Sequence, residues 1–299
     1  MGFFSNLFGS NKPKPEAHHN PQPQARPQQP ATQEGEGPSK LSLMLLYDRT
    51  PALQQESLAA EIKQRMGAAV TDVTLVGEGG SFLGKVAFGD DEITLAGLGM
   101  PFPTQVLKPI LAVCHFPEAA KAKLLDSQVH ILLSYKSSST SPIEQFDRLY
   151  QVMAAMQQLA PGALGVVNES AMTAHPADMI PNVAQERGQL AGPAMPFGSW
   201  LAWTGACVKY ILDANTIWFV TKGNHQFGLP ELAFCGGPKD GNDTMGLFNG
   251  LFAYMYFYKA VLLPGHTADL GAHKLRFSEL QQYQDLMMGK FGTLVVSNR

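Results

Sequence analysis

The side chains of this sequence that could do chemistry lie mainly in its second half, and no recognisable catalytic spacing joins them. Four of them are candidates for a binding site: His175, His225, Glu231 and His266. Imidazole and carboxylate groups can transfer protons or bind a small molecule when a fold brings them together. The four would suit a hydrolase or another small-molecule enzyme if they converged in one cleft. No residue is assigned a catalytic role from sequence position alone.

Other reactive groups point to structure rather than to chemistry. Asp269 and His273 could join the histidines around a metal ion, but no pair of ligands has the spacing that places both on one face of a predicted helix. Cys114 and His115 are sequence neighbours that point in different directions, so a buried structural cysteine is expected. The sequence holds no G-x-S-x-G or H-E-x-x-H motif. We therefore expect neither a metal nor a cofactor.

The elements that must position the candidate residues are a mixture of strands and helices. Strands are expected at 41–47, 70–76, 82–88, 92–98, 129–135, 163–167, 201–212, 216–221 and 231–235, and helices at 51–66, 117–125, 142–160 and 243–262. The Gly-rich segment 77–81 predicts a hairpin turn, and 97–101 predicts a strand exit. No regular alternation of strand and helix occurs, which indicates an α+β fold of mainly antiparallel sheet covered by helices.

The clearest local signal is the start of the helix after residue 141. Ser141 and Glu144 have the spacing of a capping box, and Pro142 falls at the first helical position, where a missing amide proton costs little. Apolar side chains recur through this helix at helical spacing: Ile143, Phe146, Tyr150, Met153 and Met156.

The sequence predicts three parts. Residues 1–10 form a short apolar peptide, and residues 11–40 a Pro/Gln-rich linker that brings too little apolar surface to fold. Residues 41–299 form the globular α+β body, either as one domain or as two related lobes, 41–160 and 161–299. Phe3, Phe4, Leu7 and Phe8 line one face of a short helix, which could dock weakly on a membrane surface or in a partner's groove. The alternative is a frayed terminus.

Composition narrows the partners and the compartment. The net charge of -3 comes without a Lys/Arg cluster, so no nucleic-acid partner is expected on charge grounds. Three widely spaced cysteines fit a reducing cytoplasm better than a disulfide framework. The apolar N-terminal stretch is far shorter than the ~20 residues of a membrane-spanning helix.

One segment carries a family resemblance. Residues 217–232, read with 163–166 and 262–267, resemble the bacterial family known as domain of unknown function 4261, over roughly residues 42–270. The resemblance implies no activity. In physical terms the segment predicts a demanding hairpin in which Glu231 caps backbone amides, or a ligand or partner site that uses His225 and Glu231.

These observations together predict a bacterial cytoplasmic protein that acts as a non-enzymatic binding or interaction module of the immunity or adaptor type. A protein partner is expected, because flexible presentation of a folded body suits interaction and needs no catalytic constellation. The alternative remains a small-molecule enzyme with a His/Glu pocket.

Overall fold

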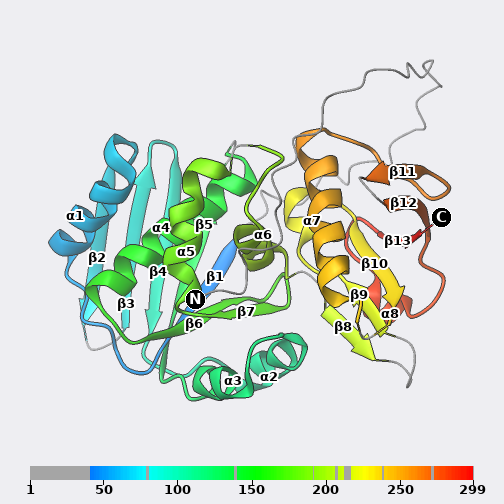
Figure 1. Ribbon diagram of the computed structural model, residues 1–299. Coiled ribbons are helices and arrows are strands. Elements are labelled where there is room, and N and C mark those ends of the chain that lie inside the picture. The colour runs from blue at the N-terminus through cyan, green and yellow to red at the C-terminus, as the bar shows by residue number, and fades with distance from the viewer. Residues whose placement is uncertain are drawn as a thin grey trace. The chain divides into compact units, whose positions relative to one another are not determined.

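The computed structural model of the chain (Figure 1) describes residues 41–298, apart from 79–80, 138–139, 191, 206–207, 212–216, 238 and 271–272. The predicted N-terminal peptide, with Phe3, Phe4, Leu7 and Phe8, and the predicted linker therefore lie outside the described residues.

The first sheet is antiparallel throughout. Its strands are β1 (Ser42–Tyr47), β2 (Asp72–Glu78), β3 (Ser81–Phe88), β4 (Asp91–Leu98), β5 (Val129–Lys136), β6 (Ala163–Asn168) and β7 (Thr173–Pro176). They lie in the order β2-β3-β4-β5-β1-β6-β7. Every neighbouring pair is antiparallel. The α+β class is confirmed, and β2 and β3 form the hairpin predicted around residue 79.

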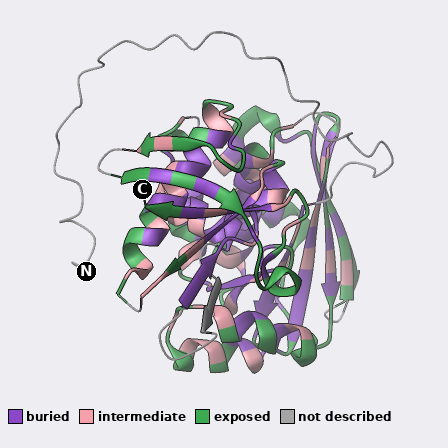
Figure 2. Cartoon of the chain, turned by 90° about the vertical axis from the view of Figure 1, so that its right-hand side faces the viewer, coloured by how far each residue is buried: buried purple, intermediate pink, exposed green. Residues whose placement is uncertain are grey.

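Helices cover the two faces of this sheet unequally. One face packs against α1 (Gln55–Met66), α4 (Pro142–Leu159) and α5 (Met179–Gln185), which lie in front of the sheet in Figure 1. In the part of the chain that the structure describes, α2 (Thr104–Val113) and α3 (Glu118–Leu125) cover only a portion of the other face, where they pack against β1, β6 and β7. Figure 2 shows buried and exposed positions alternating along these strands.

The second sheet is mixed. Its strands are β8 (Val208–Ile211), β9 (Ile217–Val220), β10 (Glu231–Gly236), β11 (Thr267–Leu270), β12 (His273–Glu279) and β13 (Thr293–Asn298). Their order is β11-β12-β13-β10-β9-β8. The β10–β13 pair is parallel and the other pairs are antiparallel. The helices of this part are α6 (Phe197–Thr204), α7 (Gly241–Phe257) and α8 (Gln284–Met287).

One large hydrophobic cluster joins the two sheets. Buried residues of one continuous cluster include Leu45 on β1, Phe146 on α4, Leu232 on β10 and Phe277 on β12. The first sheet continues past residue 160, because β6 pairs with β1. The predicted lobe boundary between 160 and 161 therefore does not coincide with the change of sheet, which comes after β7.

Three elements differ from their predictions. The helix predicted at 243–262 is α7, which already ends at Phe257. The first helix begins at Gln55 rather than at Pro51, and no side chain caps it. Residues 201–204, predicted as strand, belong to α6, whose Trp200 and Trp203 are completely buried. A helix that is apolar on all sides shows no helical periodicity, so its sequence could not be told from that of a buried strand.

The predicted capping box at α4 is half correct. The Glu144 amide donates to Ser141 Oγ at 3.4 Å, and all five stripe residues of the helix are buried. The Glu144 side chain pairs with Arg148 instead of turning back to the Ser141 amide, because the guanidinium group one turn along offers a charged partner.

We expect Ser141→Ala to lower the free energy of unfolding by ~1 kcal/mol, because it removes the cap from the longest helix described. Urea denaturation followed by circular dichroism measures this. Ser141→Asp is the matched control, since aspartate also caps helices and should leave stability close to that of the wild type. Equal stability of all three proteins would contradict a stabilising cap.

Candidate functional site

Glu231 is the centre of a cluster of hydrogen-bonded polar groups in the segment 217–232, which we call the motif. It is the first residue of β10, and its side chain is 1% exposed. One carboxylate oxygen accepts from Thr221 Oγ1 at 2.6 Å and from the Asn224 amide at 3.2 Å. The other accepts from the His225 amide at 3.2 Å and from His225 Nδ1 at 3.0 Å. The carboxylate thus binds the first amides of the 3-10 helix Asn224–Phe227, as the hairpin interpretation predicts.

Two glycines allow the chain to reverse here. A Cβ atom on Gly223 would lie 2.6 Å from the Cα atom of Thr204, so the backbone of α6 can approach only a glycine. Gly228 ends the 3-10 helix with a φ of 72°, in the left-handed region that glycine adopts without strain. The turn is therefore set by backbone requirements, and the Glu231 carboxylate is occupied by donors from its own hairpin.

His175 lies apart from this hairpin, on β7, and is buried. Its Nε2 lies 3.2 Å from the Ala202 carbonyl oxygen and 3.3 Å from Thr173 Oγ1. A carbonyl oxygen can only accept, so Nε2 carries the proton. Burial lowers the pKa of His175 to about 4, which keeps the ring neutral near pH 7.

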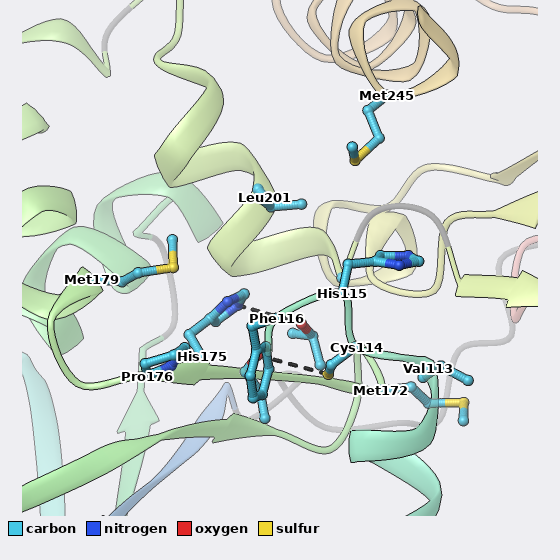
Figure 3. Close-up of a pocket in the computed structure, with 13 residues that line it drawn as sticks. Val113, Cys114, His115, Phe116, Met172, His175, Pro176, Met179, Leu201 and Met245 are labelled. Carbon is cyan, nitrogen blue, oxygen red and sulfur yellow. Dashed lines mark hydrogen bonds between the residues drawn. The ribbon is translucent and has the colours of Figure 1, made fainter. Parts of the chain in front are cut away.

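A cavity of about 190 Å³ opens beside His175 (Figure 3). Residues from the α2–α3 connection, β7 and its flanks, α5, α6 and α7 line it: Val113, Cys114, His115, Phe116, Met172, Thr173, Ala174, His175, Pro176, Met179, Leu201, Gly205 and Met245. Most of these side chains are apolar. The Cys114 thiol donates to the Ile110 carbonyl at 3.1 Å, and burial raises its pKa, so it is a neutral thiol in the wall.

The structure brings together only one pair among the four predicted site residues. His225 and Glu231 are in contact, whereas His175 lines the cavity and His266 is exposed in the turn before β11. Among the residues that the structure describes, no group of three or more His, Cys, Asp or Glu side chains is placed to hold a metal ion.

A row of apolar side chains crosses the open face of the first sheet, and the sequence analysis missed it. Residues directly opposite one another in antiparallel strands point to the same face. The registers give one continuous line across five strands, from β2 to β1: Val76, Leu83, Ala96, Leu132 and Met44. We call these five residues the apolar row. Val76 and Leu83 are 73% and 66% exposed, and the other three are partly buried.

The neighbouring row on the same face is polar. It runs from β2 to β1 through Thr74, Lys85, Thr94, Ser134 and Ser42. Lys85 pairs with Glu92 at 3.0 Å, on the same face. At its inner end the apolar row meets the cluster under α2 and α3, where Met44 packs. An exposed apolar strip is thus continuous with a buried core and bordered by polar side chains.

Comparisons with known proteins identify one segment of the chain. The model of a family described as "Domain of unknown function (DUF4261)" matches residues 220–289, from the end of β9 to just beyond α8. The resemblance is confirmed for this segment, which starts later and ends later than the sequence analysis expected. No curated protein and no solved structure matches the chain.

Within the described residues, no helix is both long and apolar enough to cross a membrane.

Proposed function

We propose that this chain, which carries a DUF4261 domain at residues 220–289, is a non-enzymatic module that binds a protein partner through the apolar row. The observation that carries the proposal is the exposure of Val76 and Leu83 on an open sheet face. The water-facing side of an antiparallel sheet is normally polar, and contiguous exposed apolar residues mark interaction sites. Burying one such side chain contributes ~1.5–3 kcal/mol.

The surroundings of the apolar row indicate the kind of partner. An interface commonly has an apolar centre and a polar rim. Here Lys85, Glu92 and Thr94 supply polar groups beside the row. The complementary partner surface would carry an apolar strip that covers the apolar row. Beside that strip it would carry polar side chains that can pair with the positive charge of Lys85 and the negative charge of Glu92. The assignment to a cytoplasmic immunity or adaptor protein, without nucleic acid as a partner, belongs to the same proposal.

The geometry gives less support to a small-molecule enzyme with a His/Glu pocket. Glu231 already accepts from four donors, and neither it nor His225 lines the cavity beside His175. A general base needs an accessible acceptor within hydrogen-bonding reach of its substrate. Weak docking through Phe3, Phe4, Leu7 and Phe8 to a membrane or a partner stays a prediction beside the proposed function.

Leu83→Lys tests the proposal, with Thr94→Lys as its matched control. Both positions are exposed on the same face, one in the apolar row and one in the polar row. We expect wild type and Thr94→Lys to recover the same protein from native lysate, identified by mass spectrometry, and Leu83→Lys to recover about tenfold less, because it loses apolar burial.

Circular dichroism and thermal melting establish that both variants are folded before the recovered proteins are compared. Equal recovery of every protein by all three forms would contradict binding through the apolar row. A hydrolytic activity that Leu83→Lys retains and His175→Phe loses would instead favour the enzyme.

A further inference from the structure

His175 lines the cavity and has one ring nitrogen to which the described residues make no hydrogen bond. Both hydrogen-bond contacts of the ring, with the Ala202 carbonyl and with Thr173 Oγ1, involve Nε2. Because Nε2 carries the proton, Nδ1 of the neutral ring is an acceptor. Nδ1 has no partner among the residues that the structure describes. A ligand in the cavity could therefore supply a donor to Nδ1.

The lining favours neutral ligands. None of the thirteen lining residues is Lys, Arg, Asp or Glu. Burial holds His175 neutral, and the Cys114 side chain is a thiol that donates to a backbone carbonyl. A carboxylate or an ammonium group entering this cavity would lose hydration to a mostly apolar wall. The lining therefore favours a neutral molecule over a charged one.

The volume of the cavity and its methionine lining limit the size and shape of the apolar part of the ligand. An apolar cavity of about 150 Å³ is large enough for benzene, and this one measures about 190 Å³. Three methionines from separate parts of the chain line it: Met172, Met179 and Met245. In Figure 3 their side chains lie around the space beside His175. Methionine adapts its shape and contacts aromatic rings favourably. The lining therefore suits an aromatic ring that carries one or two substituents.

We propose that this cavity binds a small neutral molecule whose apolar body is about the size of a substituted benzene ring and whose single donor group bonds to Nδ1 of His175. The cavity and the apolar row are formed by different residues. This inference can therefore be tested independently of the proposed protein partner. A phenol is the simplest member of this class.

Three probes of nearly equal size test the inference on the full chain: p-cresol, toluene and benzoate. They share a ring, but only p-cresol carries a neutral donor and only benzoate carries a charge. Binding is followed by the methyl signals of Met172, Met179 and Met245 in protein labelled at methionine methyl groups. We expect p-cresol to shift these signals and to bind roughly fivefold more tightly than toluene, as one net hydrogen bond provides. Benzoate should leave them unchanged.

Two variants separate the hydrogen bond from the cavity. His175→Phe should make p-cresol and toluene bind equally, whereas His266→Phe, at an exposed histidine, should change neither. Met245→Trp places a larger side chain in the cavity from a partly buried position on α7, and should abolish binding of both probes even if His175→Phe fails to fold. Equal affinities in the wild type, no binding of p-cresol at millimolar concentration, or unchanged binding by Met245→Trp would each overturn the proposal.

Discussion

Glu231→Ala is expected to lower the free energy of unfolding by about 3–5 kcal/mol, the usual effect of removing one partner from a buried charged cluster. Four donors lose their acceptor at once: Thr221 Oγ1, the amides of Asn224 and His225, and His225 Nδ1. Burial lowers the pKa of Lys222, and the negative charge of Glu231 acts in the opposite direction. The substitution removes that nearby negative charge as well. Urea denaturation followed by tryptophan fluorescence measures the change.

Two further variants show whether the carboxylate causes this effect. Glu231→Gln keeps the shape and one accepting oxygen, so it should be destabilised by about 1–3 kcal/mol. Glu169→Ala removes an exposed carboxylate from a turn and should stay within ~0.5 kcal/mol of the wild type. A loss below about 1 kcal/mol for Glu231→Ala would show that the hairpin does not depend on its internal cap.

Phe227→Ala is expected to have a similarly large effect, about 3–5 kcal/mol, because it leaves a cavity in an aromatic cluster. Phe227 ends the 3-10 helix of the motif, and its ring centre lies 4.9 Å from that of Phe252 and 5.6 Å from that of Phe146. Phe146 belongs to α4 and Phe252 to α7. The Phe227 ring therefore packs between α4, which covers the first sheet, and α7, which lies beside the second sheet.

Thermal unfolding and urea denaturation of Phe227→Ala should show one cooperative transition at lower stability. Tyr254→Ala is the control, since it removes a ring from the exposed side of α7 and should change stability by less than ~1 kcal/mol. If Phe227→Ala matched Tyr254→Ala, the aromatic cluster would not be what holds the two helices together.

Local signals explain the parts of the fold that the sequence predicts well. Ser141 and Pro142 determine where α4 begins, and its apolar spacing reaches all the way to Met156. Similarly, Glu231 and His225 are only six residues apart in one hairpin, so their contact follows from the turn between them. Such features depend on neighbouring residues, which a single sequence displays directly.

Other features depend on contacts between distant residues and could not be predicted. Strand β11 has only four residues, and β12 alternates only at Leu275 and Phe277. The cavity combines Cys114, His175 and Met245 from three separate segments. The apolar row exists only through the register of five strands, because Val76 and Leu83 become neighbours of Ala96 only once the sheet has formed.

The parallel pairing of β10 with β13 affects the order in which the chain can fold during synthesis. β13 lies between β12 and β10, and the Glu231 amide donates to the Gly292 carbonyl just before β13. While the ribosome is still making the residues between these strands, one edge of β10 has no neighbour and can pair with the wrong chain. The first sheet needs no residue beyond Pro176 for its strands, so it can form earlier. Residues 293–298 therefore complete the second sheet last, and until then one edge of β10 stays unpaired.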